Sequence, residues 1–315
     1  MLKNKYHTQC KKGSLLLVAF IGIFFTFCIK TDAENITQNE QNKGTTMTSV
    51  TLNSGYEMPT LGLGTWTLTG KTCEAAVYAA LKSGYRLIDT AKYYGNEAEV
   101  GNAVRKAVAD GICKREDIFL TTKIVPWSNS PDADIDDSLA KLKVAYIDLV
   151  LLHQSGSGND KVYNAMIRAA KKGKIRSIGI SNFYTPKSVS YFIDNFEIAP
   201  AVVQNENHLF YQNNSLRDWA KSKNIHIESY YPFGGRGHTR EHFSNATVAS
   251  LAKKYGKTSA QIIVRWHLQA GYITIPGSSN PAHIAENFSV WDFSLSTDDM
   301  KALEKLNTGK RYESW

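Results

Sequence analysis

The sequence contains few cysteines, with only four among its 315 residues. Cys10 and Cys28 lie in the N-terminal segment, which leaves Cys73 and Cys113 for the rest of the chain. We expect Cys73 at the start of one helix and Cys113 just after the end of the next, at opposite ends of neighbouring elements. A disulfide needs Cα atoms within about 7 Å, so the sequence predicts two free thiols.

Charge of one sign is not strongly in excess, and no basic patch interleaved with aromatic residues is present. The net charge is +8, and residues 1–33 hold five lysines and one aspartate, so they carry half of it. We therefore expect no nucleic-acid partner. No Pro/Gly/Ser-rich linker or break in composition divides the chain after residue 48, which favours one domain over residues 49–315.

One long apolar run, Leu15–Ile29, is interrupted only by Thr26. It is shorter than the roughly 20 residues of a membrane-spanning helix. Lysines precede it, and Ala33 follows as a small residue at a plausible cleavage point. This pattern predicts an export signal over residues 1–33 or an uncleaved membrane anchor, followed by a polar, disordered linker over residues 34–48.

The localisation predicted from this segment is export, with the enzyme either periplasmic or anchored to the membrane. A barrel that stays on the cytoplasmic side of an N-terminal anchor remains the alternative. In either case the only expected membrane contact is through the N-terminal segment.

A Gly-rich phosphate turn is missing after the first predicted strand, where an open doubly wound sheet would carry G-x-G-x-x-G. Instead, short apolar strands alternate with helical segments eight times, which is the count of a (β/α)₈ TIM barrel. Asn53-Ser54-Gly55 predicts a β-hairpin that caps the N-terminal end of this barrel. The strands are expected at residues 61–66, 86–89, 118–123, 147–152, 175–181, 201–206, 225–230 and 272–275.

Four titratable residues lie at or just after consecutive strand ends: Asp89, Tyr94, Lys123 and His153. Active sites of such barrels form where the carboxyl ends of the strands meet. A lysine ammonium beside a tyrosine lowers the pKa of the phenol and makes it a better acid. Any one of these residues alone would more often be a helix cap, a packed aromatic or a rim charge, but together they favour proton donation to a carbonyl oxygen.

Two longer segments extend this pattern, Gly84–Gly101 and Gly173–Phe183. Over about residues 49–307 the sequence resembles the aldo-keto reductase family. The resemblance implies hydride transfer from NAD(P)H to the carbonyl of small aldehydes, ketones, α-dicarbonyls or keto-sugars. It also implies a monomer, no metal, and Asp89, Tyr94, Lys123 and His153 as the catalytic residues, with Tyr94 as general acid.

The same resemblance implies a cofactor site along the later strand ends. Ser181, Asn182 and Gln204 would hold the nicotinamide carboxamide, and Tyr230 would stack on its ring. Phe233 and Gly234 begin a Gly-rich turn that can close over the pyrophosphate. Ser278, His283, Glu286 and Asn287 would hold the adenosine end of the cofactor.

One departure from the family bears on the choice of cofactor. The family usually has Ile-Pro-Lys-Ser here and an arginine six residues after the lysine, and the two cations bind the 2′-phosphate of NADPH. This chain has Gly277 and His283 at those positions. Arginine binds phosphate through two parallel hydrogen bonds from its guanidinium, which histidine cannot form. We expect NADPH as cofactor, with use of NADH also possible for this site.

The substrate side is predicted from Trp66, which matches an aromatic of the family pocket, together with His153 and Gln154. A short polar loop after His153 predicts an open pocket of low selectivity. Two other hypotheses remain open at this point. One is an exported, non-catalytic barrel that binds a nucleotide or other ligand; the other is a metal-dependent sugar isomerase, which would need more inward-facing ligands than the strand ends supply.

Overall fold

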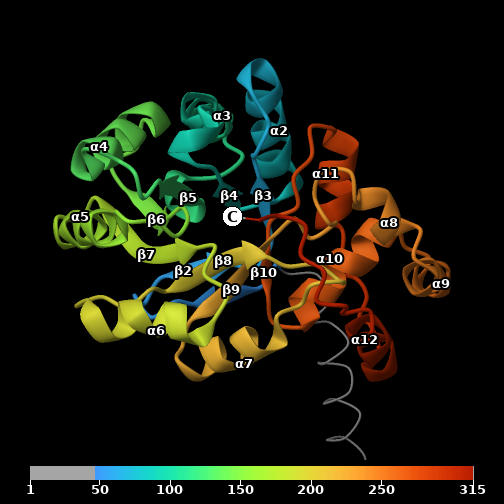
Figure 1. The fold of residues 1–315 in the computed structure, drawn as a ribbon. Coiled ribbons are helices and arrows are strands. Elements are labelled where there is room, and N and C mark those ends of the chain that lie inside the picture. Colours follow the sequence, from blue (N-terminus) through green and yellow to red (C-terminus); the bar gives the residue numbers. More distant parts are fainter. Residues whose placement is uncertain (1–46, 315) are drawn as a thin grey trace, which may run out of the picture. The chain divides into compact units, whose positions relative to one another are not determined.

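Eight parallel strands form the centre of the computed structural model, which describes residues 47–314 (Figure 1). Each strand pairs with the next one along the chain, from β3 to β10. A parallel bridge from Leu61 to Thr274 joins the first strand region to the last and closes the barrel. The (β/α)₈ prediction is therefore confirmed. The strands are β3 Gly62–Gly64, β4 Leu87–Asp89, β5 Phe119–Ile124, β6 Ile147–Leu152, β7 Ile175–Ser181, β8 Val202–Glu206, β9 His226–Tyr230 and β10 Ile273–Thr274.

Helices surround the strands as an outer ring (Figure 1). Their apolar residues recur every three or four positions, as Val100, Ala103, Val104 and Ala107 do in α3, where they form one buried face. These helices are α2 Gly70–Ser83, α3 Glu97–Ala109, α4 Pro131–Leu142, α5 Asn159–Lys171, α6 Pro186–Asn195, α7 Asn214–Ser222, α9 Ala246–Tyr255, α10 Ser259–Gln269, α11 Pro281–Phe288 and α12 Thr297–Glu304.

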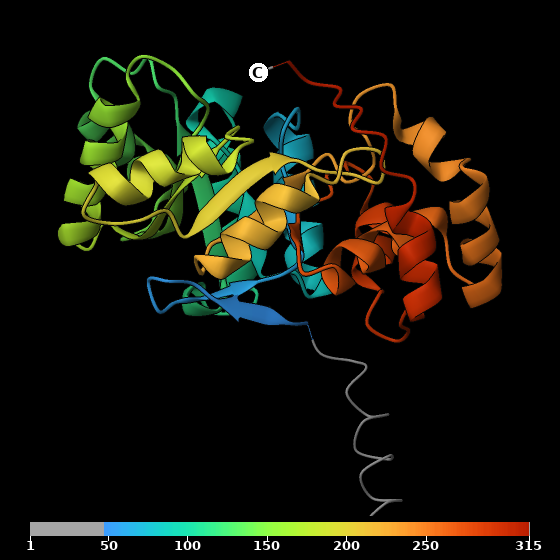
Figure 2. The ribbon, with the colours of Figure 1, turned by 60° about the horizontal axis from the view of Figure 1, so that its bottom comes forward.

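The predicted hairpin is present as β1 Ser49–Thr51 and β2 Glu57–Pro59, paired antiparallel. Leu52 and Met58 are buried with the apolar residues that fill the barrel interior. Figure 2 shows the hairpin at one end of the barrel and the C-terminal tail at the other. The tail is held there by Glu206 at the end of β8, whose carboxylate accepts hydrogen bonds from the backbone amides of Tyr312 and Glu313.

Some details differ from the sequence-based expectations. The eighth strand contains only two residues, and a short helix, α8 Thr239–Phe243, lies in the loop after β9 where only a Gly-rich turn was expected. Cys73 and Cys113 are free thiols, as predicted. The predicted signal or anchor over residues 1–33, and nearly all of the linker over 34–48, lie outside the described residues.

Candidate active site

The four polar residues of the strand ends come together at the carboxyl end of the barrel. Asp89 is the last residue of β4, Lys123 lies in β5, and His153 directly follows β6. Lys123 Nζ lies 2.6 Å from Asp89 Oδ1 and 3.1 Å from the hydroxyl oxygen of Tyr94. Adjacent parallel strands end at the same edge, so residues distant in sequence share one site.

The backbone after β4 fixes the position of Tyr94. This tyrosine lies in a short 3₁₀ turn, η1 Lys92–Tyr94, which Gly95 ends with a left-handed backbone of φ +70°. The buried side chain of Asn96 accepts a hydrogen bond from Thr90 and donates to the backbone oxygens of Thr65 and Leu68. These bonds tie the turn to the loop after β3 and aim the phenol at Lys123.

Burial and neighbouring charges shift the pKa values of Tyr94 and Lys123 in opposite directions. Burial raises the pKa of Tyr94 to about 12, even though Lys123 lowers it. Burial alone would lower the pKa of Lys123, but Asp89 and Tyr94 more than offset this, so the pKa of the ammonium is raised. The lysine is therefore a fixed positive charge directly beneath the phenol, and it also donates to the backbone oxygen of Thr90 at 2.9 Å.

His153 is held as a neutral imidazole. Burial, with a contribution from Lys123, lowers its pKa to about 3. Its ring packs edge-on against Tyr93 and Tyr94, with centroid distances of 6.2 and 5.6 Å. Nδ1 is buried without a hydrogen-bond partner among the residues that the structure describes. A neutral imidazole has one N–H to donate, which suits it to bind an oxygen atom in the pocket.

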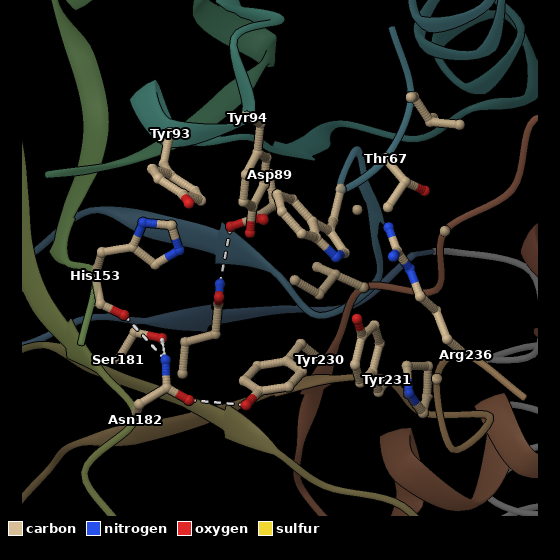
Figure 3. A pocket seen from close by; sticks show the side chains of 18 of the residues that line it. Thr67, Asp89, Tyr93, Tyr94, His153, Ser181, Asn182, Tyr230, Tyr231 and Arg236 are labelled. Atoms are coloured by element: carbon tan, nitrogen blue, oxygen red, sulfur yellow. Dashed lines mark hydrogen bonds between the residues drawn. The ribbon is translucent and has the colours of Figure 1, made fainter. Parts of the chain in front are cut away.

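A cavity of about 630 Å³ opens above these residues. Figure 3 shows Tyr93, Tyr94 and His153 on one side of it, with Tyr231 and Arg236 on the other. Its volume is typical of a pocket for a small organic ligand. The predicted site residues that line it are Trp66, Asp89, Tyr94, His153, Gln154, Ser181, Asn182, Gln204, Tyr230, Phe233 and Ser278. Lys123 lies just below this surface and is fully buried.

Hydrogen bonds fix the side of the cavity formed by β7 to β9. Asn182 has a left-handed backbone with φ +67° and accepts a hydrogen bond from the hydroxyl of Tyr230 at 2.8 Å (Figure 3). Its amide nitrogen donates to the backbone oxygen of His153 and to the hydroxyl of Ser181. The ring of Tyr230 is therefore held in one orientation at the cavity wall.

Four residues predicted for the cofactor site are absent from the lining of this cavity. Gly234 packs against His242, since a Cβ atom there would lie 2.3 Å from the imidazole ring. Along α11, His283 is exposed and Asn287 is buried, while Glu286 accepts a hydrogen bond from Thr258. Only the start of this region, Gly277 to Ser279, reaches the cavity. The roles of these four residues remain predictions.

Several lining residues were missed by the sequence-based selection. Tyr93 and Trp127 are exposed aromatics at the cavity mouth, 63% and 56% accessible. Tyr231 follows the predicted Tyr230, and Arg236 reaches over the ring of Trp66, with its guanidinium carbon 5.7 Å from the ring centroid. Trp127 comes four residues after Lys123, so its position in the loop after β5 was the available signal.

The described residues contain no group of three or more histidine, cysteine or acidic side chains that could hold a metal ion. The site is instead an ion pair, a phenol and a neutral imidazole at the floor of an aromatic-lined cavity. This arrangement is suited to proton donation to a ligand oxygen.

Comparisons with known proteins agree with this chemistry. The model of the aldo/keto reductase family matches residues 60–308. The chain is 40% identical to methylglyoxal reductase DkgA of Escherichia coli K12, over 84% of this chain and 95% of that protein. It is 35% identical to the NAD(P)H-dependent D-xylose reductase I,II of Candida tropicalis, over 85% and 94%. A Bombyx mori aldo-keto reductase solved in complex with NADP superposes with a TM-score of 0.77 at 31% identity, over 84% and 94%.

The prediction of an exported enzyme, periplasmic or membrane-anchored, is corrected by these comparisons. The relatives are reductases matched over nearly their whole length, and none of them points to export. Between residues 47 and 314, no helix is long and apolar enough to cross a membrane. An apolar run after lysines was therefore too weak a signal to assign a location.

The family assignment rests on agreement between independent observations. The family model spans most of the barrel, and the relatives are covered almost completely. The residues that the family motifs single out meet at one end of the barrel in the structure. This chain belongs to the aldo-keto reductase family, whose members are NAD(P)H-dependent carbonyl reductases.

Proposed function

We propose that this chain reduces the carbonyl of small aldehydes, ketones, α-dicarbonyls or keto-sugars, with Tyr94 as general acid. The observation that carries the proposal is the contact of Lys123 Nζ with both Asp89 and the Tyr94 hydroxyl at the floor of the cavity. The names of two relatives, a methylglyoxal reductase and a D-xylose reductase, support small carbonyl compounds and sugars as the substrate class.

The proton comes from the Tyr94 hydroxyl in this proposal. Negative charge develops on the carbonyl oxygen as the carbonyl carbon is reduced, and the resulting alkoxide is a stronger base than a phenolate. Transfer from Tyr94 is therefore favourable even though burial raises the pKa of its phenol to about 12. The ammonium of Lys123, 3.1 Å from the phenol oxygen, stabilises the phenolate that forms.

His153 orients the substrate oxygen. Because its pKa is lowered to about 3, the imidazole is neutral at physiological pH and brings no second positive charge to the floor of the cavity. One ring N–H can donate to the carbonyl oxygen, while its packing against Tyr93 and Tyr94 limits rotation of the ring. Positioned acid catalysis of this kind contributes about 10²–10⁴-fold to the rate.

The cavity wall fits a nicotinamide cofactor. Tyr230 offers a ring held by Asn182, and the bare backbone of Gly235 and Gly277 lets a ligand approach closely. Ser181, Asn182 and Gln204 line the same wall with polar groups that can bind a carboxamide. When bound, the reduced nicotinamide supplies the hydride.

We propose NADPH as cofactor with a weakened preference over NADH. Gly277 and His283 replace the two cations that the family usually places around the 2′-phosphate, and His283 lies outside the cavity lining. Arg236 lines the cavity and is exposed, so it is the cation available to an anionic part of the cofactor. We also propose that the protein acts as a monomer, as the resemblance to the family implies.

The test compares two neighbouring tyrosines in an assay that follows NADPH consumption with methylglyoxal. Tyr94→Phe removes the proposed acid and should lower kcat by at least 10²-fold. Tyr93→Phe removes a hydroxyl at the cavity mouth and should lower kcat by less than tenfold. The proposal fails if the wild-type protein shows no reduction of any of these carbonyl classes, or if Tyr94→Phe keeps wild-type activity.

A further inference from the structure

Glu228 is a buried carboxyl group that the reduction described above does not use. It lies in β9 directly opposite Gln204 of β8 in the strand register, and its side chain is fully buried inside the barrel. Its Oε2 atom lies 2.8 Å from the amide nitrogen of Gln204. That same nitrogen lies 2.8 Å from Oδ2 of Asp89. Gln204 therefore stands between an acid of the catalytic group and a second acid that has no assigned role.

This contact determines which way the amide of Gln204 faces. An amide nitrogen only donates hydrogen bonds, whereas the amide oxygen only accepts them. Two carboxyl oxygens beside one end of the side chain require the nitrogen at that end. The oxygen is then the other terminal atom of an amide whose side chain lines the cavity. An acceptor at this place suits the N–H groups of a carboxamide.

Burial and the nearby charge of Asp89 favour the protonated form of Glu228 at neutral pH. The groups that face it are Asp89 from β4, Lys123 from β5 and Gln204 from β8, while its neighbour in β10 is the apolar Ile273. One ammonium thus faces two carboxyl groups, and Asp89 already binds it at 2.6 Å. Burial and the charge of Asp89 raise the pKa of Glu228 to about 8. Its Oε1 atom has no hydrogen-bond partner among residues 47–314 and can carry the proton.

We propose that Glu228 is a positioning residue for the nicotinamide, acting through Gln204. It holds the amide of Gln204 so that the amide oxygen accepts a hydrogen bond from the carboxamide of the cofactor. This inference rests on the proposed function, because it assumes that a nicotinamide occupies this wall of the cavity.

The experiment measures binding of NADP⁺ and of 2′-phospho-ADP-ribose, which lacks only the nicotinamide, by quenching of tryptophan fluorescence. Glu228→Leu removes the acceptor while keeping most of the side-chain volume. This substitution should lower the affinity for NADP⁺ about five- to tenfold, which corresponds to the loss of one hydrogen bond. Affinity for 2′-phospho-ADP-ribose should change less than twofold. Glu228→Met serves as a second variant without the acceptor if Glu228→Leu does not fold.

Two further variants separate positioning from general destabilisation. Glu228→Gln keeps an oxygen that can accept from Gln204 and should restore NADP⁺ affinity to within threefold of wild type. Glu97→Leu removes another buried carboxyl, one that accepts a hydrogen bond from Thr122 and does not line the cavity. It should lower stability while leaving the ratio of the two affinities unchanged.

A double-mutant cycle with Gln204→Ala completes the test. If Glu228 acts through Gln204, the double variant should bind NADP⁺ less than twofold more weakly than Gln204→Ala alone. The inference is overturned if Glu228→Leu leaves the affinity for NADP⁺ unchanged, or if it lowers the affinities for both ligands equally. It is also overturned if the effects of Glu228→Leu and Gln204→Ala on NADP⁺ binding are additive. Failure of the wild-type protein to bind NADP⁺ would instead contradict the proposed function.

Discussion

At the scale of single residues, the site depends on a balance between burial and charge at Tyr94. The sequence predicted that a lysine would lower the pKa of the phenol, and the lysine does lie 3.1 Å away. Burial nevertheless outweighs it, and the pKa rises to about 12. Sequence spacing identified the contact but could not weigh desolvation, because desolvation depends on every atom packed around the phenol.

The cofactor preference is also decided by single residues. Gly277→Lys together with His283→Arg restores the two cations that the family usually carries. We expect the ratio of NADH to NADPH dissociation constants to increase at least tenfold, because the 2′-phosphate gains charge-assisted hydrogen bonds. The measurement is a pair of fluorescence titrations on the variant and the wild type.

The matched control for this change is Gly277→Met with His283→Gln, which adds similar length without charge. This pair should leave the ratio within threefold of wild type. An equal shift from the uncharged pair would show that shape, rather than charge, sets the preference. No shift from the charged pair would contradict the assignment of these positions to the 2′-phosphate.

At the scale of elements, helices are predictable where the sequence carries strong signals for the first and last turns. Helix α9 spans Ala246–Tyr255 because Asn245 caps its first turn and Gly256 ends it in a left-handed conformation. Helix α8 was missed because it lies among glycines, where local sequence favours a turn. Its position depends on packing around His242, which is buried and cannot be recognised from spacing.

Contacts between helices give a prediction at this scale. Gly101 of α3 faces the end of α4, and a Cβ atom there would lie 2.4 Å from the backbone oxygen of Leu142. Gly101→Ala should therefore lower the free energy of unfolding by about 1–3 kcal/mol, despite the better helix propensity of alanine. Urea denaturation measures this change.

Asn102→Ala, at the next position of the same helix, provides the control. Its side chain is only half-buried, so the substitution should change stability by no more than about 0.5 kcal/mol. If Gly101→Ala proved neutral or stabilising, the close approach of α3 to α4 would not limit this position.

At the scale of the whole molecule, the barrel and its active end were predictable because strand ends repeat the same pattern. Eight apolar strands predicted the closed sheet, and polar residues at their ends predicted which edge carries the site. Tyr93, Trp127 and Arg236 could not be selected this way. They lie in loops, and their approach to one cavity depends on how the loops fold over the barrel.

Buried histidines predict how the stability of the whole molecule depends on pH. Burial lowers the pKa of His242 and His267 to about 4 and that of His153 to about 3, below the ordinary value of 6.5. Between pH 6.5 and 4 the unfolded chain binds these protons and the folded chain does not. Stability should therefore fall as the pH is lowered, by roughly 1.4 kcal/mol per pH unit for each histidine.

Urea denaturation at pH 7, 6 and 5 measures this dependence. We expect the free energy of unfolding to decrease at each step, with the larger loss below pH 6. His267→Gln, which removes one fully buried imidazole, should reduce the slope. A free energy of unfolding that stays constant down to pH 5 would show that these histidines become protonated in the folded state.

The most direct test of the account is a fluorescence titration of the purified protein with NADPH and with NADH, followed by addition of methylglyoxal. We predict saturable binding of both nucleotides and oxidation of the bound nucleotide once the carbonyl is added. Binding without oxidation would contradict the reductase mechanism assigned to Asp89, Tyr94, Lys123 and His153. Absence of binding for both nucleotides would contradict the cofactor site itself.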